Sequence, residues 1–312
     1  MKVYSRKGDI VMKKAGIFKK SYSDTIFDYV NVIVMIILLI IFIWPLWFVV
    51  IASFSNPSEV WRGNVILWPK GFTMAAYEAI VQYKAIWIGY RNTIFYTVVG
   101  TLVNLIMTIC AAYPLSRKDF MPRNFLMFMF MLTMYFSGGL IPTYLVVSKL
   151  NLVNSPWAMI IPGAVSIYNV IITRTYFINS IPSSLQEAAE LDGANSFKFL
   201  TKIVLPLSKP IIAVIALYYA VGHWNDFFSA LIYINNKDLM PLQSFLRDLL
   251  MTNKMSLTNM QGLDAAQAEA KMQLAQTLKY SAIIVSTVPV LCIYPFIQKY
   301  FVKGIMIGSV KG

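Results

Sequence analysis

The chain has 312 residues, of which 58% are hydrophobic and only 13% are charged, and its mean hydropathy is +0.62. These values exclude an ordinary soluble protein and predict an all-α membrane protein, because hydrocarbon excludes charged side chains from most of a membrane-embedded chain. The net charge of +13 could indicate nucleic-acid binding, but the Lys and Arg residues flank the apolar runs, so we expect no nucleic-acid partner.

Six apolar stretches are long enough to cross a hydrocarbon layer of about 30 Å as helices. They cover residues 30–53, 93–115, 125–147, 157–178, 211–234 and 281–298. The sequence lacks the ten-residue alternation of a membrane β-strand, so helices are the expected spanning form. Four prolines fall within these stretches, and we expect them to kink the helices without ending them: Pro45, Pro142, Pro162 and Pro289.

The segment 1–29 precedes the first span and carries seven Lys or Arg residues. A secretory signal peptide also starts with a basic region, but this apolar run is too long and no clear cleavage site follows it. We therefore expect a cytoplasmic basic tail followed by a transmembrane domain over residues 30–312. In this orientation the cytoplasmic segments carry 17 of the 27 Lys and Arg residues, which predicts that both termini are cytoplasmic.

The inner segment 180–210, between the fourth and fifth spans, is longer than a simple connection between two helices requires. Ser184 and Glu187 have the spacing of a capping box, which predicts the start of a short helix. Gly193 is placed to end that helix and to permit a turn. A second short helix is expected over residues 196–205. The segment thus predicts a bent pair of helices under the membrane.

This segment resembles the EAA loop of ABC importer permeases. The matching residues are Glu187, Ala188, Ala189, Asp192 and Gly193, followed by Ile203, Val204, Leu205 and Pro206. The resemblance implies a six-helix permease whose loop acts as a coupling helix and docks into a cleft on a cytoplasmic ATPase. Glu187 would be the polar anchor, the two alanines would permit close approach, and Gly193 would permit the turn. The alternative is an amphipathic helix that lies on the membrane surface without a partner.

The resemblance extends from the first span to the C-terminus and points to the maltose-type, complex-polysaccharide branch of these permeases. It rests on residues 151–155, 160–162, 191–194 and 224–226. It implies import of oligosaccharides or polysaccharide fragments across the bacterial cytoplasmic membrane by a multi-pass chain in contact with lipid. The implied partners are a second, different permease subunit, an ATPase dimer that binds ATP and Mg, and an extracytoplasmic solute-binding protein, which the outer segment 235–280 would approach.

Two ionisable side chains lie away from the ends of the expected spans, His223 and Asp226 in the fifth. Such groups indicate a transport path or a paired structural site. In one interpretation His223, Trp224, Asn225 and Asp226 line a sugar path through stacking and hydrogen bonds. In the other, Asn225 and Asp226 join the fifth span to a neighbouring helix. Two further candidates for the path, with interhelical hydrogen bonding as the alternative, are Asn169 and Asn104.

The sequence has no phosphate-binding Gly-x-x-x-x-Gly-Lys-[Ser/Thr] loop, no Cys/His metal cluster and no nucleophile motif. We therefore expect no catalytic residue, no metal and no cofactor in this chain. Cys110 and Cys292 each lie in an apolar run and are expected to be buried. Three rival classes stay open: an ion-coupled secondary transporter, an ABC importer of amino acids, phosphate or metal, and a membrane-anchored enzyme.

Overall fold

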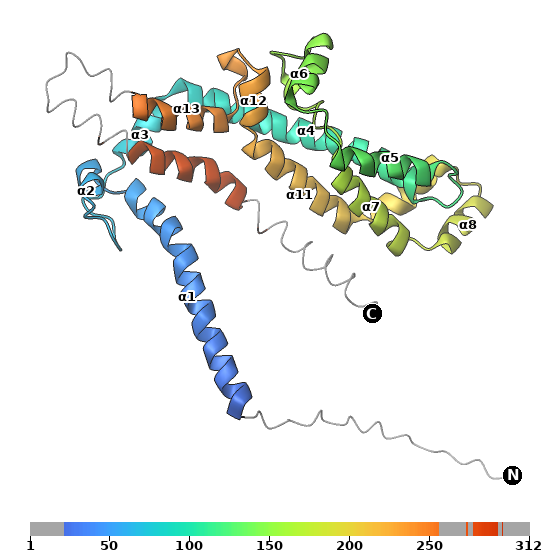
Figure 1. Ribbon diagram of the computed structural model, residues 1–312, viewed down its shortest axis with the longest axis horizontal. Helices are drawn as coiled ribbons and strands as arrows, with labels where there is room; N and C mark the ends of the chain where they lie inside the picture. Colours follow the sequence, from blue (N-terminus) through green and yellow to red (C-terminus); the bar gives the residue numbers. More distant parts are fainter. Residues whose placement is uncertain (1–21, 256–272, 274–276, 293–294, 296–312) are drawn as a thin grey trace. The chain divides into compact units, whose positions relative to one another are not determined.

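The computed structural model describes residues 22–255, 273, 277–292 and 295 (Figure 1). The chain divides into two units, residues 1–48 and 49–312. Regular secondary structure among the described residues is entirely helical, as predicted. Its elements are α1 (Tyr22–Ser53), α2 (Pro57–Trp61), α3 (Ala75–Gln82), α4 (Lys84–Ser116), α5 (Arg123–Tyr135), α6 (Leu140–Lys149), η1 (Pro156–Met159), α7 (Ile167–Ser180), α8 (Ser183–Leu191), α9 (Ser196–Phe199), η2 (Leu200–Val204), α10 (Leu205–Leu207), α11 (Lys209–Asn225), α12 (Phe228–Tyr233), η3 (Lys237–Leu239) and α13 (Leu242–Met255).

The first unit consists, in its described part, of most of α1. This helix has 32 residues and the apolar composition of a membrane span, and it continues through Pro45 as predicted. Its length corresponds to about 48 Å, which exceeds the hydrocarbon thickness of a bilayer. Most of the predicted basic tail, residues 1–21, lies outside the described residues.

The second unit is arranged around α4, a helix of 33 residues that also qualifies as a membrane span. Helices α11 and α7 pack along α4, and α13 packs against it as well (Figure 1). The N-terminal part of α4 is fixed by the segment before α13: Asn92 Nδ2 donates to the backbone oxygens of Asp238 and Met240, at 2.8 and 3.0 Å. Helix α4 starts at Lys84, before the apolar stretch begins.

The predicted span 125–147 is not one continuous helix. Helix α5 ends at Tyr135 and α6 begins at Leu140, and the two differ in direction by 116°. Gly139, which precedes α6, has a φ of +85°, a backbone conformation that glycine adopts without steric cost. The break therefore falls at the glycines and not at Pro142, which occupies the first turn of α6 where a backbone N–H is not needed.

The predicted span 157–178 is an α-helix only from Ile167 onward. Its first part is the 3₁₀ turn η1, followed by a turn that contains Pro162 and Gly163. The prediction that Pro162 only kinks a helix is wrong, because a proline without an N–H and an adjacent glycine both disfavour continuation of a helix.

The predicted span 211–234 also has a break. Helix α11 ends at Asn225, Asp226 has extended backbone, and α12 begins at Phe228. The Oδ1 atom of Asp226 accepts a hydrogen bond from the backbone N–H of Ser229 at 3.0 Å, and so satisfies a donor at the start of α12. The polar residues predicted for the middle of this span therefore lie at the end of a helix.

A further apolar helix, Thr277–Cys292, covers the first part of the predicted span 281–298 and contains Pro289. The rest of this span lies almost entirely outside the described residues. Among the described residues, two helices have the length and composition of a membrane span, or up to four if each bent pair counts as one. The bent pairs are α5 with α6, and the stretch Ser196–Leu207 with α11. Six continuous helices, as the hydropathy predicts, are not seen in the described part of the chain.

Cys110 and Cys292 are exposed, so the prediction that both are buried is wrong. Both residues lie on apolar helices. In a membrane protein the outer surface of such helices contacts lipid instead of water, so an apolar run does not by itself indicate burial within the chain.

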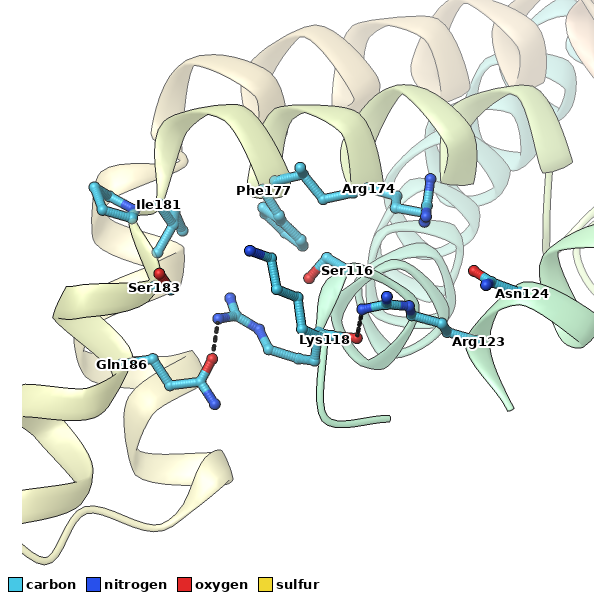
Figure 2. Close-up of a pocket in the computed structure, with 12 residues that line it drawn as sticks. Ser116, Lys118, Arg123, Asn124, Arg174, Phe177, Ile181, Ser183 and Gln186 are labelled. Atoms are coloured by element: carbon cyan, nitrogen blue, oxygen red, sulfur yellow. Dashed lines mark hydrogen bonds between the residues drawn. The ribbon is translucent and has the colours of Figure 1, made fainter. Parts of the chain in front are cut away.

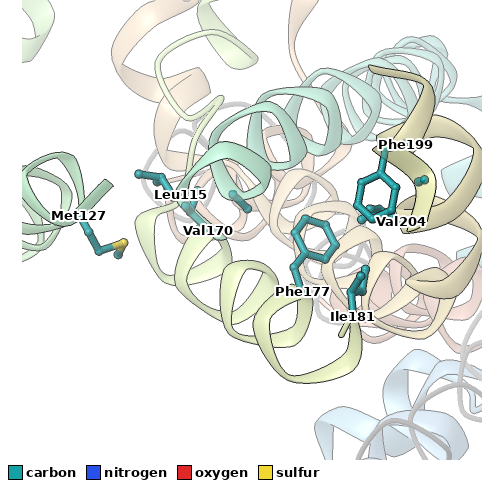
Figure 3. Packing of buried hydrophobic residues seen from close by; sticks show 9 residues of the cluster. Leu115, Met127, Val170, Phe177, Ile181, Phe199 and Val204 are labelled. Atoms are coloured by element: carbon teal, nitrogen blue, oxygen red, sulfur yellow. The ribbon is translucent and has the colours of Figure 1, made fainter. Parts of the chain in front are cut away.

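The loop segment between α7 and α11 is packed into the second unit (Figure 3). Phe177 of α7 and Val204 of η2 have 0% exposed surface, and both belong to one cluster of buried side chains. The same cluster contains Leu115 from α4, Met127 from α5 and Phe199 from α9. The α8 to α10 segment is therefore a fixed part of the helical core and not a free loop.

Candidate functional site

Helix α8 begins two residues earlier than the capping-box spacing predicts. Its N-cap is Pro182, which has extended backbone and makes no side-chain capping bond, and Ser183 is the first helical residue. Ser184 therefore lies inside the helix and the predicted capping box does not form. Proline is favourable at this point because it ends the preceding segment and needs no hydrogen-bond acceptor.

The C-terminal end of α8 has the hydrogen bonds of a Schellman motif. The N–H of Gly193 donates to the carbonyl of Glu190 at 3.0 Å, and the N–H of Ala194 donates to that of Ala189 at 2.9 Å. Gly193 has a φ of +72°, as a residue at this position requires. Asn195 then caps α9 by accepting from the N–H of Lys198 at 2.8 Å. The predicted turn between two short helices is confirmed.

The two faces of α8 differ in burial. Ala189 is 6% exposed and packs in the core cluster, with Leu185 packed against it. Glu187 and Ala188 are exposed, and Leu191 is 90% exposed. On α9, Phe197 is 74% exposed. A carboxylate and two large apolar side chains therefore lie on the surface of this segment, a composition typical of a binding surface.

The remaining motif residues are found in the same segment. Asp192 lines a groove of about 280 Å³ between α8 and the helices that follow it, together with Lys198 and Lys202. Pro206 lies in α10 directly after the π-helical turn η2 and is exposed. Single π-helical turns occur mostly at functional sites, and here the wider turn precedes a proline that cannot donate to the helix.

Arg117 joins α8 to the end of α4. Its Nη1 atom donates to Oε1 of Gln186 at 2.8 Å. Its guanidinium carbon lies 4.8 Å from the centre of the Tyr113 ring and 5.1 Å from that of Phe199, which is the geometry of a cation–π contact. The sequence analysis missed this residue, although its place directly after the second span and the aromatic Tyr113 one helical turn before it are visible signals.

A second feature is a cavity of about 190 Å³ between α4, α11 and the turn before α7. His223, Asp226, Asn104 and Gly163 are among the residues that line it. The Nδ2 atom of Asn104 lies 3.2 Å from Nε2 of His223 and 3.4 Å from the backbone oxygen of Gly163. His223 and Asp226 therefore line the same cavity, and each has a different hydrogen-bond partner.

Two polar contacts join α4 to α11 at the same level of the bundle. Asn104 contacts His223, and one helical turn away the hydroxyl of Thr108 lies 2.7 Å from that of Tyr219. Gly100 lies against the His223 ring, since a Cβ atom there would be 2.4 Å from Nε2. The sequence analysis missed Gly100, Thr108 and Tyr219; the four-residue spacing on both helices was the signal that could have revealed the last two.

The other candidates for the transport path do not line this cavity. Trp224 is 6% exposed, and its Nε1 atom donates to the backbone oxygen of Ser286 in the Thr277–Cys292 helix at 3.1 Å. Asn225 points elsewhere, with its Nδ2 atom bonded to the backbone oxygen of Val221 at 2.9 Å. Asn169 is buried in the first turn of α7. The cavity thus contains His223, Asp226 and Asn104 from the predicted set.

The long apolar helices and the polar cavity between them define a helical membrane protein. The chain belongs to the family of binding-protein-dependent transport system inner membrane components, whose sequence profile matches residues 83–307. This match confirms the resemblance to ABC importer permeases that the α8 segment carries.

Two relatives from Bacillus subtilis (strain 168) match almost their whole length. The polygalacturonan/rhamnogalacturonan transport system permease protein YtcP is 42% identical over 93% of this chain and 99% of its own. The protein LplC is 40% identical over 92% of this chain and 95% of its own. Their similarity confirms that the chain is a transporter permease and not an enzyme.

A crystal structure of a bacterial ABC transporter involved in the import of the acidic polysaccharide alginate contains a chain with the same fold. The TM-score is 0.81 at 33% sequence identity, and the match covers 90% of this chain and 99% of that one. The overall arrangement of the helices is therefore similar to that of a chain from a known transporter.

Proposed function

We propose that this chain is one of two transmembrane subunits of an ATP-driven importer of oligosaccharides or polysaccharide fragments. The sugar class is taken from the relatives, whose names refer to polygalacturonan, rhamnogalacturonan and alginate. In this proposal the chain forms half of the translocation path and crosses the bacterial cytoplasmic membrane six times, with both termini in the cytoplasm. A second, different permease, an ATPase dimer that binds ATP and Mg, and an extracytoplasmic solute-binding protein complete the complex.

The observation that supports this proposal best is the α8 segment. It presents the exposed side chains of Glu187, Leu191 and Phe197, while its opposite face is buried in the core. A short helix that is fixed to the bundle in this way transmits the movement of a docked ATPase as a rigid body. The bond from Arg117 to Gln186 connects α8 directly to α4, the helix that also carries the cavity residue Asn104.

The cavity supports the proposal that the substrate path lies between α4 and α11. Its lining offers the imidazole of His223, the carboxylate of Asp226 and the hydroxyl of Tyr218, which are groups that bind sugar hydroxyls. The alternative role of His223 is helix packing, through the contact of its side chain with Asn104. Both uses are compatible, because among the described residues the Asp226 carboxylate accepts a hydrogen bond from the backbone N–H of Ser229 through one oxygen and has its second oxygen available.

The proposal is tested by the change Glu187→Lys in the reconstituted complex with its ATPase and solute-binding protein. Reversal of a charge at a protein interface should lower ATP-dependent sugar uptake by roughly tenfold or more. The matched control is Asp119→Lys, which reverses an exposed charge outside α8. We expect this control to retain uptake. Normal uptake with Glu187→Lys, in a complex that contains the variant at the usual level, would contradict the proposed role of α8.

A further inference from the structure

A third cavity, of about 470 Å³, lies where α4 ends, α5 begins, α7 ends and α8 begins (Figure 2). Four cationic side chains line it: Arg117, Lys118, Arg123 and Arg174. No carboxylate is among the described residues that line this cavity. Four like charges around one space repel one another, so the arrangement favours an anion.

The protein itself provides few partners for these cations. Arg117 donates to the Gln186 side chain, Arg123 Nη1 to the backbone oxygen of Arg117, and Arg174 Nε to that of Leu115, at 2.8, 2.9 and 2.9 Å. Each guanidinium has five N–H donors, so most of them stay available. Within the described part of the chain, none of the four cationic groups forms an ion pair with a carboxylate.

Arg117 is the most buried of the four. Only 8% of its surface is exposed, and its Nε atom is buried without a hydrogen-bond partner. Burial lowers the pKa of the Arg117 guanidinium, because the surroundings disfavour its positive charge. Asp119, an exposed residue that does not line the cavity, opposes this effect. An anion in the cavity would stabilise the buried charge.

Two helices also begin at this cavity. Neither α5, with 13 residues, nor α8, with nine, has a side-chain cap at its N-terminus. Both Arg123 and Ser183, the first residues of these helices, line the cavity. The N–H groups of Arg123 and Leu185 donate to Phe120 and Pro182, and the positive end of each helix dipole adds to the four cations. Together these groups form a site for an anion with several oxygen atoms, such as a phosphate.

Apolar side chains also line the cavity or lie close to it in sequence. Phe177, Ile178 and Ile181 are among the lining residues, and Figure 2 labels Phe177 and Ile181. Met121 and Phe125, which flank Arg123 in sequence, are 94% and 64% exposed. The cavity also lies at the end of α4, a helix with the length of a membrane span, and therefore at the depth of lipid headgroups. A ligand that joins a phosphate to apolar chains fits both the cations and these side chains.

We propose that this cavity binds the headgroup phosphate of an anionic phospholipid, with its acyl chains along the exposed apolar residues of α5. Basic pockets between membrane helices are suited to such headgroups. The proposal depends on the membrane position of α4, but not on contact between α8 and an ATPase. Its failure is therefore distinguishable from failure of the proposed coupling.

The test uses the full-length chain, purified in an uncharged detergent and titrated with dioctanoyl phosphatidylglycerol. Binding is followed by the rise in the thermal unfolding temperature. We expect a saturable rise with this lipid and a much smaller one with dioctanoyl phosphatidylcholine or inorganic phosphate. An equal rise with inorganic phosphate would overturn the lipid assignment, and no rise with any of the three would overturn the site.

The double variant Lys118→Gln/Arg123→Gln should bind the anionic lipid roughly 30-fold more weakly, since each lost charge should weaken binding about fivefold. The single variant Lys118→Gln serves if the double variant does not fold, because Lys118 is exposed and forms no hydrogen bond within the described residues. It should bind several-fold more weakly than the unmodified chain.

The matched control is Lys198→Gln/Lys202→Gln, which removes two cations from the groove beside α8 and leaves the cavity unchanged. It should bind the lipid as the unmodified chain does. An equal loss in this control would show attraction to surface charge and overturn the site. The proposal also fails if Lys118→Gln/Arg123→Gln leaves lipid affinity unchanged and instead releases the ATPase from the assembled complex, since the cavity would then bind a protein.

Discussion

At the scale of single residues, a mutation can test how closely the His223 ring packs against Gly100. The absent side chain of Gly100 makes room for the imidazole, which in turn reaches Asn104 on the same helix. A glycine within a long helix weakens it, so this position is retained for packing and not for helix stability. Small residues allow close approach of membrane helices in general.

We predict that Gly100→Ala lowers the stability of the chain by about 1–3 kcal/mol, because the added methyl group displaces the His223 ring. The measurement is thermal unfolding in detergent. Gly222→Ala is the matched control, since a Cβ atom at Gly222 would contact nothing within 4 Å. It should be neutral or slightly stabilising. Equal unfolding temperatures for the two variants would show that the imidazole does not occupy the space beside Gly100.

Two variants of Asp226 can separate a structural role of its carboxylate from a role in transport. Its carboxylate accepts from the N–H of Ser229 and also lines the cavity. Asp226→Asn keeps an acceptor of the same size, whereas Asp226→Ala removes it and should cost about 1 kcal/mol of stability. We expect Asp226→Asn to fold normally but to alter substrate-stimulated ATPase activity. Normal stimulation in the Asn variant would indicate that Asp226 only caps α12.

At the scale of elements, the α8 segment depends on a backbone conformation and not on a single contact. Gly193 has a positive φ, and no atom outside its chain neighbours would come within 4 Å of a Cβ there. A substitution at Gly193 therefore acts through backbone strain alone. The Schellman bonds that it permits set the direction in which the chain enters α9.

We predict that Gly193→Val lowers ATP-dependent uptake while the chain still reaches the membrane, because valine disfavours this backbone conformation by about 1–2 kcal/mol. Gly63→Val is a matched control. Gly63 has nearly the same φ, +73°, and equally open surroundings, but lies in the turn after α2. Uptake is measured in vesicles that contain the full complex. Equal losses of uptake in both variants would mean that backbone strain at either glycine lowers uptake, and that the α8 segment has no special role.

At the scale of the whole molecule, the orientation in the membrane is open to direct measurement. The distribution of Lys and Arg predicts that the α8 segment is cytoplasmic and that the turn after α2 is outside. Cys110 and Cys292 would first be replaced by serine. A single cysteine is then introduced at Asn64 or at Lys198, both of which are exposed.

A maleimide that does not cross membranes should label Asn64→Cys in intact cells and Lys198→Cys only in inside-out vesicles. Each cysteine serves as the control for the other, because the reagent and the chain are the same. Reaction of Lys198→Cys in intact cells would place α8 outside, where no cytoplasmic ATPase could reach it. The proposed importer would then be wrong in its orientation and in its coupling.

The sequence by itself determined the membrane class, the approximate places of the apolar helices and the bent pair α8 and α9. These features depend on local properties: the hydropathy of about twenty successive residues, and the backbone preferences of Gly193 and Asn195. The local signal was insufficient where two preferences compete. Apolar residues favoured continuous spans over 125–147 and 157–178, but Gly139, Pro162 and Gly163 interrupt them.

Only the tertiary structure decided which side chains meet. It placed His223 against Asn104, Trp224 against the Thr277–Cys292 helix and Arg117 against Gln186, contacts between residues that are about 60 to 120 positions apart. It also gathered four cationic residues from three segments around one cavity. Such contacts depend on how helices cross and rotate, and many distant side chains pack together to set those angles.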